Sequence, residues 1–294
     1  MDNIAYCTLD DARLELASDS TADDDKLQRN IRTASRRVDG LLRNRVPLFA
    51  PVTETRRIVV TGHAIDSHLG TLNLGTNFLL SAASVTRADG TALTISTEWD
   101  YYPTSGQTPY TALRRLSCCG SWYDWCSSTC DSYRYISIAG VWGYQTDYAT
   151  AWLSIDTLAA AVTTASATEI TLTNADGTDT YYSIPRLSVG SVIRIDTEAL
   201  DIVRINYNTN KATVRRGVLR TVAATHTNGT AVDVWQVEEP VRRGVARQAA
   251  FMNARRGKFD VVTGDGMGGT TRYPQDLLPE FVSILNEYQY DRTY

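Results

Sequence analysis

The sequence predicts an α+β protein, with a helical bundle host domain, a small β-layer and an inserted all-β module that is a barrel or a sandwich. Two changes of hydrophobic period indicate this fold class. Apolar residues recur every three or four positions near both ends of the chain, whereas apolar and polar residues alternate in the middle. We expect a host domain of residues 1–150 plus 239–294, with strands within 58–144, and an inserted module of residues 151–238.

The N-terminal region predicts two helices. Thr8 is a candidate N-cap of the first, and Asp11 supplies a carboxylate to its first turn. The second helix begins with the acidic run Asp23 to Asp25, and the prolines after it end the helix. Its apolar stripe consists of Leu27, Ile31, Ala34, Val38, Leu41 and Leu42.

The middle of the chain predicts two sets of strands. Segments such as "RRIVVTG" and "YRYISIAGVWGY" alternate apolar and polar residues between Gly, Asn and Asp turns, and "RADGTAL" carries a hairpin Asp-Gly. A second set occupies residues 155–237, with a tight turn at 206–210. This second set is long enough to fold as a small barrel or sandwich.

The helical period returns after Pro240. Val241, Val245, Ala249 and Met252 share one face, and arginines surround it. A Gly-rich segment, 263–272, precedes a final amphipathic helix within 276–288. Neither terminal group of helices can bury its stripe alone, so we expect helices from both ends of the chain to pack together.

Composition excludes several classes of protein. The chain has 294 residues, of which 43% are apolar, but it has no apolar run long enough for a transmembrane helix. The N-terminus lacks the basic and apolar order of a secretory signal. The net charge of −4 gives no overall signature of nucleic-acid binding, although acidic and basic residues are clustered.

Motifs for catalysis are absent from the sequence. The three histidines, His63, His68 and His226, have no cysteine or carboxylate at a metal-binding spacing, and no HExxH, Walker or GxSxG motif occurs. We expect surface or hydrogen-bonded histidines, no cofactor and no enzymatic activity. The "GDGMGG" stretch has no strand before it, which favours a linker over a phosphate loop.

Four cysteines fall within "SCCGSWYDWCSSTC", residues 117–130. Cys119, Cys126 and Cys130 are weak zinc candidates, because only the last two approach the spacing of a zinc knuckle. Outside the reducing cytosol, disulfides can instead form among Cys118, Cys119, Cys126 and Cys130, and free thiols are a third possibility. Trp122 and Trp125 predict either a protein interface or local packing of this loop.

Three segments together resemble the head-to-tail adaptor (connector) family of long-tailed bacteriophages. The N-terminal "YCTLDDARLEL" with "DDDKLQRNIRTASRRVDGLLRNRV" is similar to the opening helix pair of that family. "YRYISIAGVWGY" is similar to its strand ending in Trp-Gly-Tyr, and "EPVRRGVARQAAFMNARRGKF" to the helix that follows. Family members often pass directly from that strand to that helix, whereas residues 151–238 intervene in this chain.

The resemblance implies a structural, non-enzymatic virion protein. Adaptors form a ring, usually of twelve copies, beneath the portal, where the ring extends the DNA channel and docks the tail. The implied partners are further copies of the chain, the portal protein, the tail terminator or next neck protein, and genomic DNA without sequence-specific binding. The implied location is the neck of the virion, after assembly in the host cytoplasm, with the final helix reaching into the portal.

A ring of this kind needs two different complementary faces on each subunit. The acidic N-terminal region and the basic helix after Pro240 are candidates, with protein contacts favoured over DNA contacts for this helix. The predicted interface residues are Arg242, Arg243, Arg247, Arg255, Arg256, Leu277, Leu278, Phe281, Leu285, Tyr288, Trp122 and Trp125. Two further roles are compatible with the sequence: a neck or tail-completion protein of another ring layer, and a virion-surface module that binds a glycan or decoration partner through residues 155–237.

Overall fold

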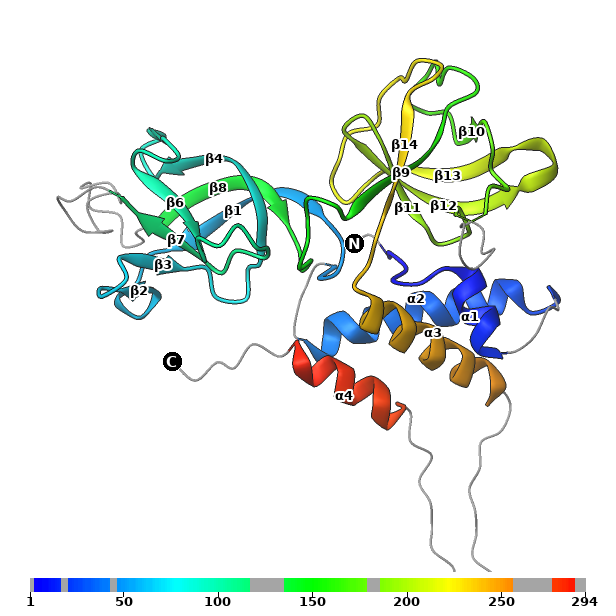
Figure 1. Ribbon diagram of the computed structural model, residues 1–294, viewed down its shortest axis with the longest axis horizontal. Helices are drawn as coiled ribbons and strands as arrows, with labels where there is room; N and C mark the ends of the chain where they lie inside the picture. The colour runs from blue at the N-terminus through cyan, green and yellow to red at the C-terminus, as the bar shows by residue number, and fades with distance from the viewer. Residues whose placement is uncertain are drawn as a thin grey trace, which may run out of the picture.

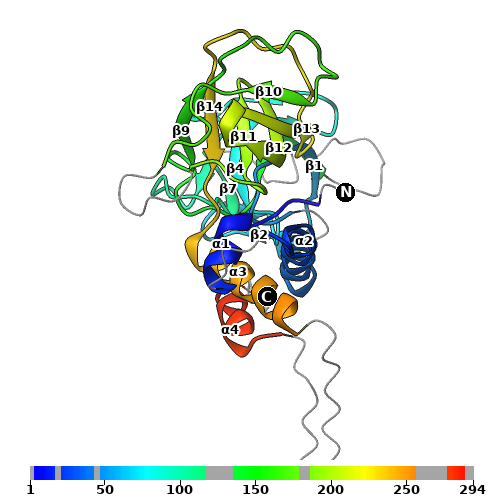
Figure 2. The same ribbon diagram turned by 90° about the vertical axis from the view of Figure 1, so that its right-hand side faces the viewer.

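The computed structural model describes residues 3–16, 21–42, 47–116, 135–178, 186–255 and 277–288. A β-sandwich lies at one end of the long axis, a six-stranded β-unit lies at the other, and a layer of helices packs under the six-stranded unit (Figures 1 and 2). None of the described helices is long and apolar enough to span a membrane.

The predicted helical bundle host domain with a small β-layer is wrong. The described residues form three antiparallel sheets, of four, four and six strands, and four α-helices. Most buried apolar side chains of the strands between residues 52 and 142 form a core of their own, and only a few, such as Val52 and Leu80, belong to the core of the helix layer. The fold is therefore mostly β.

Two four-stranded sheets form the sandwich. The first has the order β1 (Val52–Val59), β8 (Tyr135–Trp142), β4 (Leu79–Arg87) and β5 (Ala92–Leu93). The second has the order β2 (Ile65–Asp66), β3 (Thr71–Asn73), β7 (Ala112–Arg115) and β6 (Trp99–Tyr102), and a 3₁₀ turn, η1 (Gly62–Ala64), precedes β2. Their shared core includes Ile58, Leu72, Leu113, Ile138 and Trp142. The predicted Asp-Gly hairpin joins β4 to β5, with Gly90 in the left-handed region at φ 88°.

The third sheet has six strands. Its order is β10 (Glu169–Thr171), β13 (Lys211–Val218), β12 (Glu198–Asn206), β11 (Val192–Ile195), β14 (Ala231–Trp235) and β9 (Trp152–Thr157). Leu158 bridges Leu172, and the N–H of Thr173 donates to the carbonyl oxygen of Thr157 at 3.0 Å, so the two edges of the sheet meet and close a barrel. The predicted turn between β12 and β13 is a 3₁₀ turn, η3 (Tyr207–Thr209), followed by Asn210 at φ 53°.

The helix layer contains α1 (Leu9–Leu16), α2 (Asp24–Leu41), α3 (Glu239–Ala254) and α4 (Pro279–Glu287). Thr8 and Asp11 form a reciprocal cap on α1, because each backbone N–H donates to the side chain of the other residue, at 2.8 and 3.1 Å. Helix α3 packs against α1, α2 and α4, so helices from both ends of the chain do share one core.

The barrel shares a core with the helix layer. Trp235 and Leu219 of the barrel belong to the same buried cluster as Ile31 and Val38 of α2. Trp235 also donates its indole N–H to the carbonyl oxygen of Phe49 at 2.9 Å. The barrel therefore rests on the helices through buried side chains.

The Trp-Gly-Tyr sequence at the end of β8 joins the sandwich to the helix layer. Trp142 is fully buried and donates its indole N–H to the carbonyl oxygen of Glu54 at 3.0 Å. A Cβ at Gly143 would lie 2.5 Å from the carbonyl oxygen of Ala50, so the chain passes too closely there for a side chain. Tyr144 packs its ring 5.7 Å from that of Phe49.

Candidate functional site

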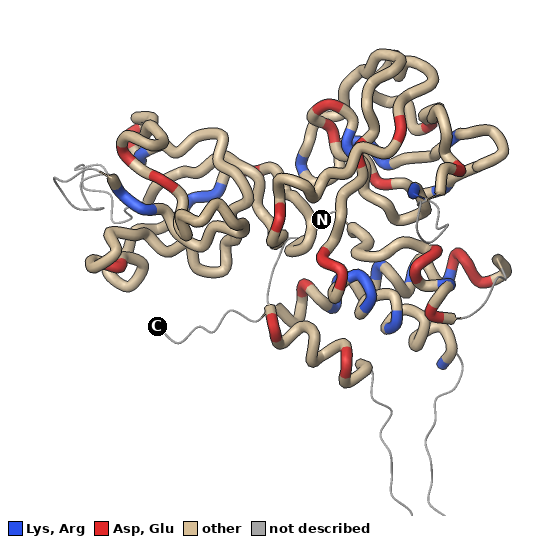
Figure 3. The backbone as a smooth tube through the Cα atoms, viewed as in Figure 1, with Lys and Arg blue, Asp and Glu red and all other residues tan. Residues whose placement is uncertain are grey.

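The predicted interface arginines of α3 pair with carboxylates of the same chain. Arg242 lies 3.6 Å from Asp11, and Arg243 lies 3.7 Å from Glu15. Arg247 donates to Glu15 at 3.0 Å and to Glu280 of α4 at 2.6 Å. The interleaved acidic and basic positions of the helix layer are visible in Figure 3. The acidic and basic regions that we expected to meet between subunits thus meet within one chain.

The other predicted interface arginines differ in position. Arg255 follows α3 and holds its guanidinium 5.0 Å from the ring centroid of Phe251, as a cation–π contact. Arg256 lies outside the described residues. The described arginines of α3 are therefore held by carboxylates or by a ring of their own chain.

The predicted interface side chains of the last helix belong to the core. Phe281 and Leu285 are each only 2% exposed, and Leu277, Leu278 and Tyr288 pack against the same cluster. The N–H of Leu278 donates to the side-chain oxygen of Gln248 in α3 at 2.9 Å, which satisfies one free donor at the start of α4. Helix α4 is thus bound to its own chain by apolar packing.

The cysteine-rich segment lies outside the described residues, and with it Cys118, Cys119, Cys126, Cys130, Trp122 and Trp125. Cys7 is described, and its thiol is free and buried next to α1. Burial, followed by the charge of Asp11, raises the pKa of this thiol well above its usual value. Cys7 is therefore a core side chain and not a reactive nucleophile.

The histidines divide into two kinds. His63 and His68 are exposed in the sandwich. His226 is buried in the barrel, where Nδ1 lies 2.8 Å from Asp196 Oδ2 and Nε2 lies 2.9 Å from Glu198 Oε2. The isolated position of His226 in "THTNGT" had given no sign of these two carboxylates.

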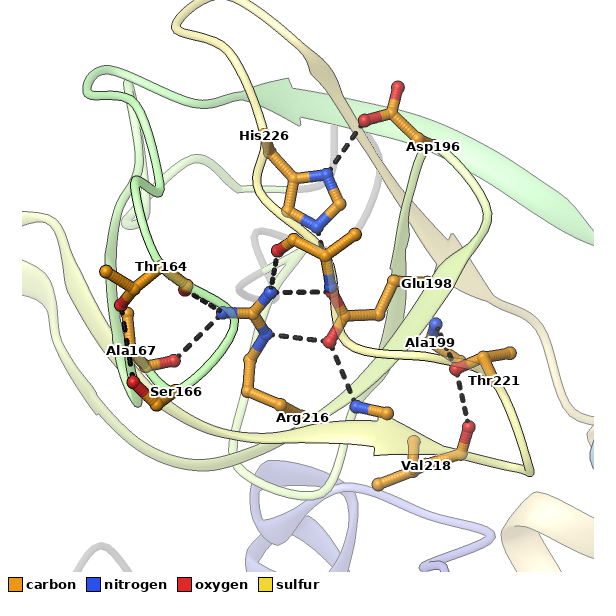
Figure 4. Close-up of polar contacts among 12 residues, drawn as sticks. Thr164, Ser166, Ala167, Asp196, Glu198, Ala199, Arg216, Val218, Thr221 and His226 are labelled. Carbon is orange, nitrogen blue, oxygen red and sulfur yellow. Dashed lines mark hydrogen bonds and ion pairs between the residues drawn. The ribbon is translucent and has the colours of Figure 1, made fainter.

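Glu198 and Arg216 form the centre of a buried polar network in the barrel (Figure 4). Arg216 binds both carboxylate oxygens of Glu198, through Nε at 2.7 Å and Nη2 at 2.6 Å. Its Nη1 donates to the carbonyl oxygens of Thr164 and Ala167, at 3.3 and 3.0 Å. The pair therefore ties β12 and β13 to the loop between β9 and β10.

Backbone groups complete the coordination of Glu198. The N–H groups of Gly217 and Ala224 each donate to this carboxylate at 2.9 Å. Burial alone would raise the pKa of Glu198, but the bonds from Arg216, Ala224, His226 and Gly217 outweigh it and lower the pKa to about 2. Glu198 is thus ionised at neutral pH, and its charge holds the segments around it together.

The network around Glu198 stabilises the barrel, because its hydrogen-bonding groups are directed at one another. Both ring nitrogens of His226 face carboxylates, so neither is free to activate a nucleophile. Arg216 is occupied by Glu198 and by backbone carbonyls. In the described ranges, no group of three or more His, Cys, Asp or Glu side chains is arranged to hold a metal ion.

A second internal carboxylate lies in the helix layer. Asp39 of α2 accepts hydrogen bonds from the Tyr6 hydroxyl at 2.6 Å and from the N–H of Leu48 at 3.0 Å. Burial raises the pKa of Asp39 to about 6, because these bonds and the charge of Arg36 offset it only partly. Asp39 anchors the N-terminal segment and the chain after α2 to one helix.

An open groove of about 510 Å³ runs between α1 and α3. Leu14 and Ala246 line it, with charged residues of both helices along its sides. Leu14 is 63% exposed there. The charges around the groove are largely the α3 pairs described above, so the groove presents a mixed surface.

Comparisons with protein-family models, curated proteins and solved structures give no match. The geometry defines a mostly β protein in which a sandwich and a barrel are joined by a helix layer. The polar networks around Glu198 and Asp39 connect elements of the fold to one another.

Proposed function

We propose that the chain is a structural subunit of the head-to-tail adaptor ring of a long-tailed bacteriophage. One observation carries the proposal: the three segments that resemble this family, distant in sequence, pack together. Helices α1 and α2 pack against α3, and Val141 and Tyr144 at the end of β8 pack against the buried cluster that these helices form. Their assembly into one unit is what a shared family core requires.

In this role the ring contains twelve copies beneath the portal, extends the DNA channel and docks the next tail component in the virion neck. The subunit has no enzymatic task. Its internal networks support that role, because a subunit that must keep its shape within a ring benefits from elements tied by buried pairs. The barrel is an addition to the family core.

Assembly with a portal tests the proposal. The purified chain is mixed with portal rings and viewed by negative-stain electron microscopy. We expect it to form a second ring, coaxial with the portal. A chain that stays monomeric with portal at every protein concentration contradicts the proposal.

The interface residues need a test that spares the fold. Reversing the charge of Arg247 places a carboxylate beside Glu15 and Glu280 and damages the helix layer itself. The Arg243→Gln variant is a better test, because the Arg243 side chain is 61% exposed and its ion pair with Glu15 is long, at 3.7 Å. If Arg243 lies in a subunit or portal interface, this variant folds normally and forms fewer rings on portals; unchanged ring formation removes Arg243 from the interface.

A further inference from the structure

Two exposed arginines of α2 have no carboxylate partner among the described residues, unlike the arginines of α3. The side chains of Arg29 and Arg36 form no hydrogen bond or salt bridge with any residue that the structure describes. Arg36 acts on Asp39 only through its charge. Because no described carboxylate occupies these guanidinium groups, they can bind an external anion without first breaking an internal pair.

The arginines of α2 lie side by side. Positions 29, 32 and 36 are three and four residues apart, which places them along one side of a helix. Arg32 of this row donates from Nη2 to Asp201 of the barrel at 3.0 Å. The contact brings strands β12 and β13 against the same side of α2.

The barrel adds two further arginines at this place. Asp201 is fully buried and also binds Arg215 at 2.6 Å. A register shift between Ile202 and Arg204 returns Arg204 to the outer face of the barrel that Asp201 occupies. The side chain of Arg204 is exposed and has no hydrogen bond or salt bridge to the described part of the chain. The α2–β12 patch is defined as Arg29, Arg32, Arg36, Arg204 and Arg215.

We propose that the α2–β12 patch binds the phosphate backbone of duplex DNA without sequence preference. Among the described residues, the five arginines share a single bound carboxylate, Asp201, so the patch carries an excess of positive charge on a chain of net charge −4. Arginine is the side chain best shaped for phosphate, which it binds through two parallel hydrogen bonds. Such contacts position a protein on DNA and read no bases.

The surface between the arginines favours DNA over a protein partner. The exposed positions along this side of α2 are Asp25, Arg29, Thr33, Arg36 and Gly40, and none carries an apolar side chain. The core of a protein interface is rich in aromatic and apolar groups, whereas phosphate contacts need none. The choice of DNA as the polyanion rests on the proposed adaptor function, in which the genome passes each subunit.

The contacts are compatible with movement of DNA. Binding to phosphates through a few arginines is sequence-independent and weakens steeply with salt, and proteins held in this way slide along the duplex. The side chains of Arg29, Arg36 and Arg204, which pair with no described residue, therefore guide the duplex without anchoring it.

Fluorescence anisotropy of labelled 20-base-pair duplexes tests the patch on the full chain. Two unrelated sequences are titrated between 50 and 200 mM KCl, and equal affinities are expected. The Arg29→Ala/Arg36→Ala variant is expected to bind more weakly and to reduce the slope of log K against log salt by about 1.8, since each lost phosphate contact removes about 0.9. Adding Arg204→Ala is expected to remove about 0.9 more.

A matched control separates the patch from net charge. The Arg87→Ala/Arg114→Ala variant also removes two positive charges, from sandwich residues that pair with Glu98 at 3.5 Å and with Asp100 at 3.7 Å. It is expected to leave affinity and slope unchanged. An equal loss in both variants, or absence of binding by the native chain at 50 mM KCl, overturns the proposal. Displacement of the duplex by polyglutamate at equal charge concentration overturns it in favour of an acidic protein.

The same variants are also tested for ring formation on portals. This second measurement separates the DNA-binding patch from the adaptor role. If Arg29→Ala/Arg36→Ala forms rings and binds DNA like the native chain, the patch is wrong and the adaptor role stands. If the native chain forms no rings but the variant loses DNA binding, the patch stands without the adaptor role.

Discussion

Glu198 in the barrel and Asp39 in the helix layer are both carboxylates held inside the fold, yet their pKa values move in opposite directions. Burial is the largest single influence on each carboxylate, and it raises the pKa. For Glu198, one bidentate arginine, two backbone N–H groups and His226 outweigh burial and bring the pKa to about 2. For Asp39, a hydroxyl, one backbone N–H and a nearby arginine charge leave the pKa at about 6.

The difference shows that the donors, and not burial alone, decide the charge of an internal carboxylate. The negative charge of Glu198 is balanced by the guanidinium of Arg216 in direct contact, so Glu198 is ionised in the native barrel. Asp39 has no cation in contact among the described residues, so its protonated form is favoured to a higher pH. The two carboxylates therefore make contributions to stability that change in opposite directions with pH.

The largest effect on stability is expected when Arg216, the cation beside Glu198, is removed. Arg216→Ala leaves a buried, ionised carboxylate without its partner, which costs about 3–5 kcal/mol of unfolding free energy. Urea unfolding followed by tryptophan fluorescence measures it. The double variant Glu198→Leu/Arg216→Met is expected to lose less than Arg216→Ala, because it removes both charges. A double variant that is equally unstable would mean that the hydrogen bonds to backbone groups and to His226, and not the ion pair itself, hold the barrel.

The pH dependence of stability separates the two carboxylates. The pKa of Asp39 is raised from 3.8, so its contribution is complete below about 3.8 and is lost as pH rises through about 6, by up to ~3 kcal/mol. The pKa of Glu198 is lowered from 4.5, so its contribution is complete above about 4.5 and is lost as pH falls towards about 2.

Asp39→Asn tests the assignment of these two pH ranges. Urea midpoints measured from pH 2 to 7 are expected to lose their decline between about 4 and 6 in this variant, because the titrating group is gone. The loss of stability as pH falls below about 4.5 is expected to remain, since Glu198 is unchanged. A variant that still declines between pH 4 and 6 would assign that range to another group.

The smallest expected effect belongs to the surface pairs of the helix layer. Arg243→Ala removes an exposed guanidinium whose contact to Glu15 is 3.7 Å, and we expect a loss below ~0.5 kcal/mol. The same urea measurement applies. A loss as large as that of Arg216→Ala would show that paired surface charges hold the helix layer as firmly as the buried pair holds the barrel.

Local signals in the sequence predicted several elements well. Thr8 caps α1, the stripe containing Ile31 and Val38 faces the core, and the turn before Lys211 lies where its asparagines indicate. Each of these depends on residues within a few positions of one another. Leu41 is the exception in the stripe, at 39% exposure near the end of α2.

Charged residues were harder to interpret from sequence. The arginines of α3 and the acidic residues of α1 suggested complementary outer faces, but they lie against each other within the same chain. The apolar side chains of α4 suggested an interface and are part of the core. A stripe or a charged cluster predicts that a partner exists, and it does not say whether that partner is in the same chain.

The amino-acid sequence alone specifies where strands, helices and turns occur, because period, caps and turn residues act over short distances. Only the tertiary structure brings Glu198 together with Arg216 and His226, which lie 18 and 28 positions away in the chain. It also sets which apolar segments make a core of their own, which turned an expected β-layer into a sandwich. The physical reason is that burial and charge pairing depend on which surfaces meet, and those contacts are made between residues far apart in the chain.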